Sequence, residues 1–235
     1  MKKINVFIVV GVLILFGCTS TSNKFNFKNY QAEIDKLAEK GKISDSNKML
    51  MLDYIAIYKT DSASIIKLSY ADILTKGIEK QQGYYALIKR VKATKTEIDS
   101  ILIASLIKKY TDYTYFDSKY NKRFDLNLNN NGTKKITAFT VIIHIENKQG
   151  EILQNSTWNL TKVILPGSTI KYDGLVASYD KDSEVDRKFE ATDLKFLKVK
   201  TPIYSIIFED GSTLGFNSID IQNLKPIDAI NIFYK

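Results

Sequence analysis

The chain has 235 residues and a formal net charge of +8, with 34 Lys and Arg against 26 Asp and Glu, and it contains one cysteine and one histidine. A single cysteine excludes an intramolecular disulfide, and a single histidine excludes a metal site built from several imidazoles. The sequence has no glycine-rich phosphate loop, no CxxC pair and no HExxH motif, which argues against the enzyme classes that depend on them.

The first eighteen residues have the layout of an export signal. Lys2 and Lys3 precede an apolar run over residues 6–16, which is too short for a spanning helix, since that needs about 20 apolar residues. The run ends in LFGC, which resembles the lipobox of bacterial lipoproteins, where the signal is cut before the cysteine and the thiol carries a diacylglyceryl group. We therefore expect residues 1–17 to be a lipoprotein signal peptide and Cys18 to be lipidated. An ordinary signal peptide with an incidental cysteine is the alternative.

By the same resemblance, Thr19 after the cysteine indicates the outer membrane of a Gram-negative cell envelope. Residues 18–27 predict a flexible tether, because the stretch TSTSNKFN (19–26) is polar. Positive charge is concentrated towards the amino terminus, with 16 basic against 11 acidic residues from Thr19 to Tyr115. We favour the interpretation that these lysines form a solvated helix face. The alternative is that they bind anionic lipid headgroups. The positive charge would also suit a nucleic acid, but export argues against that partner.

Residues 28–96 predict a helical region. Apolar residues recur at helical spacing over residues 30–38 and stop at Gly41, a candidate carboxy-terminal cap. Ser46 is expected to cap a second helix, whose run MLMLDYIAIY (49–58) is apolar on nearly every side and therefore predicts burial.

A third helix is predicted to begin at Ser69, because Asp72 three residues later completes an approximate capping box. The pattern changes near Thr96. Residues 101–107 are rich in β-branched side chains and ambiguous between a helix end and a first strand, and we favour the strand.

Residues 97–235 predict a β-sandwich. Apolar and polar residues alternate in FDLNLN (124–129), and a change of parity in ITAFTVIIHIE predicts a bulge near Thr137. Further strands are indicated by TWNLTKVIL, TIKYDGLVASY, KFLKVK and YSIIFEDGSTLGF, with turns at LPGS and at Asp210 and Gly211. Short strands joined by polar turns, with no helix between them, are typical of such a sandwich. The expected fold class is α+β, an N-terminal helical segment followed by an antiparallel immunoglobulin-like β-sandwich.

Three stretches of the carboxy-terminal half carry a resemblance to a family: NNNGTKKITAFTVIIHIENKQGEIL, LPGS and YSIIFEDGSTL. They resemble the FxLYD-like domains of bacterial envelope lipoproteins, which have an immunoglobulin-like sandwich. The resemblance implies an interaction module without a cofactor and transfers no functional residues.

Few residues have the chemistry of a reaction centre. His144 is expected on the outward face of its strand, partly exposed and without metal-ligating neighbours, and no GxSxG motif accompanies it. Trp158 is expected to pack between the sheets. The alternative is that it is exposed and binds a sugar. We therefore expect no catalytic residue, no cofactor and no enzyme activity.

One acidic loop, YDKDSEVDRK, is the candidate metal site. Its carboxylates alternate as hard oxygen ligands for calcium would: Asp180, Asp182, Glu184 and Asp186. The loop departs from the helix-loop-helix calcium motif, because Val185 and Ala191 replace the required glycine and glutamate. We favour a solvated loop, with an irregular calcium site as the alternative.

The stretch KYTDYTYFDSKYNKRF, expected to link the two halves, concentrates the tyrosines Tyr110, Tyr113, Tyr115 and Tyr120. Tyrosine is favoured at interfaces because it is apolar with one polar end. We favour packing of the helices onto the sandwich, with an external interaction surface as the alternative.

The sequence as a whole predicts a lipid-anchored envelope protein that binds a partner, a protein or a cell-wall polymer. The alternative is a carrier of an apolar ligand or an inhibitor of a periplasmic enzyme.

Overall fold

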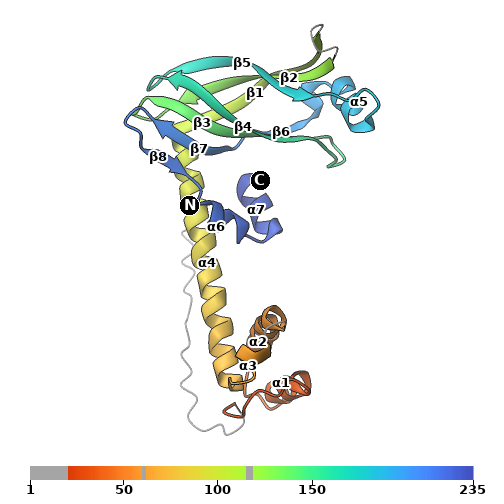
Figure 1. Ribbon diagram of the computed structural model, residues 1–235, viewed down its shortest axis with the longest axis vertical. Coiled ribbons are helices and arrows are strands. Elements are labelled where there is room, and N and C mark those ends of the chain that lie inside the picture. Colours follow the sequence, from red (N-terminus) through yellow and green to blue (C-terminus); the bar gives the residue numbers. More distant parts are fainter. Residues whose placement is uncertain (1–20, 60–61, 115–118, 235) are drawn as a thin grey trace, which may run out of the picture. The chain divides into compact units, whose positions relative to one another are not determined.

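The computed structural model describes residues 21–59, 62–114 and 119–234 (Figure 1). The chain divides into two compact units between Ala86 and Leu87, inside a helix, whereas we expected the boundary between residues 96 and 97. The signal peptide, Cys18 and Tyr115 lie outside the described residues. Among the helices of the described part, none combines the length and the hydropathy needed to cross a membrane.

The helical unit contains α1 (Tyr30–Glu39), α2 (Asp45–Tyr58), α3 (Ser62–Ile65) and the first part of α4 (Tyr70–Ile101). The predicted end of the first helix is confirmed, because Gly41 has φ +63°, a left-handed conformation that favours glycine. The predicted capping box is also confirmed. The amide of Asp72 donates to Ser69 Oγ at 3.1 Å, and the amide of Ser69 donates to Asp72 Oδ2 at 2.9 Å.

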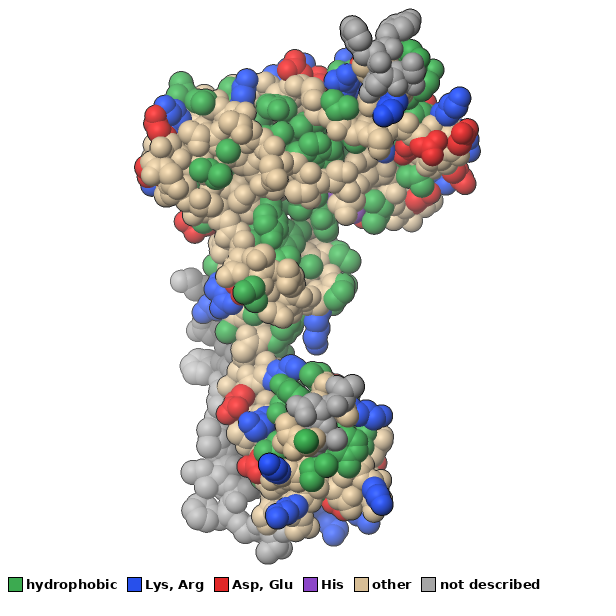
Figure 2. Space-filling model, viewed as in Figure 1, with side chains coloured by type: hydrophobic (Ala, Val, Ile, Leu, Met, Phe, Trp, Pro, Cys, Tyr) green, Lys and Arg blue, Asp and Glu red, His purple; other side chains and the backbone are tan. Residues whose placement is uncertain are grey.

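Two expectations for α2 are wrong. Its cap is Ser44 rather than Ser46, since Ser44 Oγ accepts a hydrogen bond from the amide of Asn47 at 3.2 Å. Its apolar run is not buried on every side either: Met51 is buried, but Met49 is 57 % exposed. The other elements of the unit cover only one face of this helix. Figure 2 shows apolar side chains at the surface of the helical unit with Lys side chains around them.

Residues 21–27 belong to the folded helical unit, so the predicted tether is wrong from Thr21 onwards. The amide of Phe25 donates to the Leu68 carbonyl at 2.9 Å, and the amide of Ala71 donates to the Thr21 carbonyl at 2.9 Å. The Phe25 ring is 5 % exposed and lies 5.6 Å from the ring of Tyr70, centroid to centroid. Aromatic burial offsets the entropy cost of ordering this polar segment.

The second unit contains two antiparallel sheets (Figure 1). Its strands are β1 (Leu102–Thr114), β2 (Lys119–Asn130), β3 (Ile136–Glu146), β4 (Ile152–Ile164), β5 (Thr169–Ser178), β6 (Lys198–Lys200), β7 (Ile203–Phe208) and β8 (Thr213–Gly215). One sheet has the order β1-β2-β5 and the other β4-β3-β7-β8, with β6 pairing β3.

This order matches the immunoglobulin constant-type arrangement in its shared strands. With β6 left out, β1, β2 and β5 correspond to strands A, B and E, and β3, β7 and β8 correspond to C, F and G. The difference is β4, which pairs with β3 instead of β5. The predicted α+β fold with an antiparallel sandwich is therefore confirmed.

The sandwich core lies between the facing sides of β2 and β3. Phe124, Leu126 and Leu128 of β2 are fully buried, as the alternation predicts. Asp125 was expected to face water but is 3 % exposed, and one of its oxygens lies 3.0 Å from Lys171 Nζ. The predicted bulge is confirmed by a register shift against β4 at Thr137, between Ile136 and Ala138.

The helices of this unit differ from the prediction. The α4 helix continues to Ile101, so the first strand starts at Leu102. We expected no helix between the strands, but α5 (Glu184–Ala191) and the 3₁₀ turn η1 (Leu194–Phe196) lie between β5 and β6. After the last strand the unit also contains α6 (Ser218–Gln222) and α7 (Pro226–Phe233). Arg90 of α4 holds α6 through a two-pronged ion pair with Asp220, at 2.7 and 2.6 Å.

Candidate functional site at the α5 end of the sandwich

The α5 helix is the structural centre of the candidate site. Ser183 caps it, since its Oγ accepts from the amide of Asp186 at 3.4 Å. Phe189 is fully buried and packs edge-on against Phe124 of β2, with ring centroids 5.6 Å apart. This anchor fixes the helix on the sandwich, and a groove lies on each side of it.

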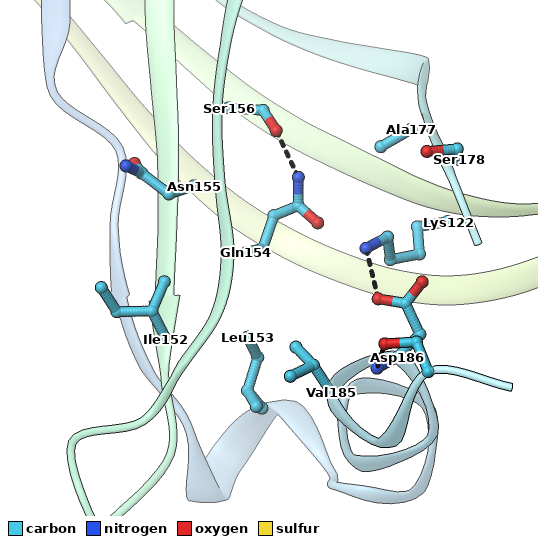
Figure 3. A pocket seen from close by; sticks show the side chains of 11 residues that line it. Lys122, Ile152, Leu153, Gln154, Asn155, Ser156, Ala177, Ser178, Val185 and Asp186 are labelled. Carbon is cyan, nitrogen blue, oxygen red and sulfur yellow. Dashed lines mark hydrogen bonds and ion pairs between the residues drawn. The ribbon is translucent and has the colours of Figure 1, made fainter. Parts of the chain in front are cut away.

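The first groove has a volume of about 340 Å³ and lies between β4, β5 and α5. Figure 3 shows Lys122 and Asp186 pointing toward each other in it. Lys122 Nζ lies 2.8 Å from Asp186 Oδ1, while Asp186 Oδ2 accepts from the amide of Asp180 at 2.7 Å. The two residues are 7 % and 8 % exposed, so each charge depends on the other for compensation.

The rest of the first groove is mostly uncharged and polar. Gln154 is buried and donates through Nε2 to Ser156 Oγ (Figure 3). Ser178 and Ser183 add hydroxyl groups to the lining. Because a lysine ammonium has three donors, Lys122 can donate to a guest in the groove while it keeps its bond to Asp186.

The second groove, of about 420 Å³, lies between β1 and the chain from α5 to η1. Lys109 Nζ donates to the carbonyl of Phe189 near the end of α5, and burial lowers the pKa of this lysine. Glu190 accepts from Thr111 Oγ1 and from the Tyr179 hydroxyl, both at 2.6 Å. These bonds lower the pKa of Glu190, and the bond to Glu190 raises the pKa of Tyr179 to about 12.

The structure brings two of the four predicted tyrosines together. Tyr113 and Tyr120 are opposite each other on β1 and β2, with ring centroids 4.9 Å apart, and are 39 % and 46 % exposed. Tyr179 lies 6.1 Å from Tyr120 and joins them; we call these three the tyrosine cluster. Tyr110 lies apart in the second groove, with Lys108 Nζ 4.5 Å from its ring centroid.

The interpretation of this stretch as a link between the halves is wrong, because it forms the facing ends of β1 and β2. Sequence reasoning missed Tyr179, which comes 59 positions after Tyr120 and carries no local signal of its own. The cluster is joined to α5 through the bond from Tyr179 to Glu190.

The carboxylates of three of the four calcium candidates have hydrogen-bond or ion-pair partners. Asp186 pairs with Lys122, Glu184 Oε1 lies 2.8 Å from Lys188 Nζ, and Asp180 accepts from the amide of Asp182 at 2.9 Å. Residues 179–188 were expected to be a loop, but α5 begins within them, at Glu184. Over residues 21–59, 62–114 and 119–234, no three His, Cys, Asp or Glu residues are grouped as metal ligands.

His144 and Trp158 have structural partners. His144 is 6 % exposed, not partly exposed as expected, because the ring of Tyr234 stacks on it at 4.4 Å. Its Nε2 lies 2.8 Å from Glu146 Oε1. Trp158 packs against Phe124, with ring centroids 5.6 Å apart. This agrees with the prediction that Trp158 packs between the sheets.

No family model and no curated protein matches this chain. It is similar to the solved ApaA protein of Bordetella pertussis (TM-score 0.29, 11 % identity, 49 % of this chain and 85 % of that one). It is also similar to the structural genomics target SoR45 (TM-score 0.26, 15 % identity, 49 % and 80 %) and to the Salmonella enterica trimeric lipoprotein SadB (TM-score 0.29, 12 % identity, 79 % and 100 %). TM-scores this low carry no argument about function.

Proposed function

We propose that this chain is a lipid-anchored protein of the bacterial cell envelope, placed in the outer membrane, whose sandwich binds another protein at the α5 end. The observation that carries the binding role is the tyrosine cluster beside two grooves that share α5. Exposed tyrosines give contact area at low entropy cost, and the grooves offer fixed hydrogen-bonding groups next to them.

The anchor rests on the lipobox-like LFGC and on Cys18. Because the Thr21 carbonyl already accepts a hydrogen bond within the helical unit, only Thr19 and Ser20 separate Cys18 from that unit. The three steps from Cys18 to Thr21 span at most ~10 Å, so the lipid would hold this unit directly at the bilayer surface. Its lysines then face anionic headgroups, which attract each basic side chain modestly.

Binding without turnover is the proposed mode of action. The charged side chains of the first groove neutralise each other, and its hydroxyls have no histidine beside them in the described part of the chain. The polar lining of the first groove also suits a protein surface better than an apolar ligand, which argues against the carrier alternative.

Cell fractionation tests the anchor. Cys18→Ser removes the thiol, so the protein is expected to move from the membrane fraction to the soluble fraction. Thr19→Ser, which keeps the cysteine, is the matched control and should stay with the membrane. A Cys18→Ser variant that still sediments with membranes would contradict lipid attachment at this residue.

Site-specific photocrosslinking in the native cells tests the binding surface. A photoreactive residue at Tyr120 is expected to give a defined crosslinked protein, and adding Tyr113→Ala should weaken that adduct several-fold. Tyr85, which is 61 % exposed in the helical unit, is the matched control position. Equal adducts from both positions, or none from Tyr120, would overturn binding at the α5 end.

A further inference from the structure

The edge strands of the two sheets differ in how they are protected from pairing. One sheet ends in β1 and β5, and the other ends in β4 and β8. Native proteins protect such edges with charges, bulges, glycine or short length, because free backbone N–H and C=O groups are templates for another strand. β1 carries Lys108, Lys109 and a register shift, β5 carries Lys171 and Asp173, and β8 has only three residues.

The β4 edge has none of these protections along its centre. Residues 153–161 (LQNSTWNLT) contain no charge, no proline and no glycine. Their pairing with β3 is regular between Gln154 and Thr161, since the register shifts lie towards the strand ends. Within the described chain, the outward backbone groups of residues 155–161 have no hydrogen-bond partner. This edge is therefore ready to accept a further strand.

The side chains of this edge are complementary to a second copy of themselves. The exposed face of the strand carries Asn155, Thr157, Asn159 and Thr161, all neutral and able to hydrogen-bond. An antiparallel twofold pairing centred on Thr157 places Thr157 opposite its own copy and Asn155 opposite Asn159 of the second copy. No like charges meet in this register.

The charges at the two ends of β4 fit the same register. Glu151, whose carboxylate pairs with Lys188 Nζ at 3.0 Å, precedes the strand. Lys162, for which the described residues show no ion pair, lies near the end of the strand. Antiparallel pairing brings the end of β4 that follows Glu151 in one copy towards the end that carries Lys162 in the other. In a twofold interface each contact between two different positions occurs twice, once from each copy.

We propose that two copies of this chain associate through their β4 edges, in antiparallel register about Thr157, so that two sheets become one continuous sheet. This interface is separate from the tyrosine cluster and does not depend on the proposed anchor.

Disulfide trapping in the full-length chain, in its own membranes, tests the pairing. Directly opposed residues of antiparallel strands have Cβ atoms about 4.5–5.5 Å apart, close enough for Thr157→Cys to bridge to its copy after small adjustment. A mild oxidant is expected to give a reducible dimer band with Thr157→Cys. Thr169→Cys, at an exposed position on the β5 edge, is the matched control, and the wild-type chain reports any crosslinking by Cys18.

The register is tested by a second pair of variants. Asn155→Cys and Asn159→Cys are each expected to give no disulfide-linked dimer alone, because each would lie about 14 Å from its own copy at ~3.4 Å per residue. Co-expressed, the two variants should give the mixed dimer. Thr157→Lys should weaken association at least tenfold, measured as a halved mass by light scattering in detergent.

The proposal is overturned if Thr157→Cys gives no more dimer than Thr169→Cys, or if it crosslinks only to a different protein. It is equally overturned if the wild-type chain is monomeric at every concentration tested, whether or not the protein is found in membranes.

Discussion

The two units differ in what holds them together. The helical unit has a core of nine buried side chains, while the sandwich has eighteen. Every buried polar or charged side chain of the described residues lies in the sandwich: Lys122, Asp125, Asn130, His144, Gln154 and Asp186. A small apolar core gives a marginal domain, whereas a larger core with paired polar groups gives a more stable and more specific one.

Because of this difference, we expect the two units to unfold separately, the helical unit first. Trp158 is the single tryptophan and lies in the sandwich, so its fluorescence reports that unit alone. Far-UV circular dichroism reports the helices of both units, so a transition seen in it but not in the Trp158 fluorescence belongs to the helical unit. We expect two unfolding transitions in urea, with that of the helical unit at the lower urea concentration.

The largest expected effect comes from Phe124→Ala. Phe124 is fully buried and contacts both Trp158 and Phe189, so truncation leaves a cavity and should cost about 3–5 kcal/mol of sandwich stability. The Trp158 transition should move to much lower urea while the helical transition stays in place. A parallel shift of both transitions would show that the units unfold together.

Breaking the buried ion pair should cost almost as much. Asp186→Ala leaves Lys122 as an unpaired buried charge, for which about 3 kcal/mol is expected. The double variant Lys122→Met with Asp186→Leu removes both charges and should recover most of the loss, as measured by the urea midpoint of Trp158 fluorescence. No recovery in the double variant would contradict an electrostatic origin.

A smaller effect is expected in the helical unit. Ser69→Ala removes the capping box at the start of α4 and should cost about 1 kcal/mol, because the amide of Asp72 loses its acceptor. The helical transition should move to lower urea and the Trp158 transition should not. Ser46→Ala, which removes no cap, is the matched control.

The smallest effect is a pH dependence of the sandwich. Hydrogen bonds from Thr111 and Tyr179 lower the pKa of Glu190, so their stabilisation is present above the usual carboxyl pKa and is lost as pH falls through the folded value. Glu190→Gln should therefore flatten the acid side of the stability profile of the Trp158 transition. An unchanged profile would show that these exposed bonds contribute nothing measurable.

The sequence correctly predicted the features that depend on contacts between neighbouring residues. Gly41, the Ser69 capping box and the bulge at Thr137 each depend on residues within a few positions, and all three are confirmed. The sandwich followed from alternation and turns, which directly report a two-sided sheet.

The remaining differences depend on contacts between distant parts of the chain. The tether was predicted from polar composition, but Phe25 finds its partners at Leu68 and Tyr70. Lys122 and Asp186 are 64 positions apart, and no sequence pattern joins them. The α5 helix did carry a signal: Ser183 followed by Asp186 is a capping pattern, which the acidic composition of the loop obscured.

The most direct test of the central claim is mass spectrometry of the mature protein purified from its own membranes. We expect a mature chain that begins at Cys18 and carries a diacylglyceryl group on the sulfur. A mature chain that begins elsewhere, or an unmodified thiol at Cys18, would contradict it.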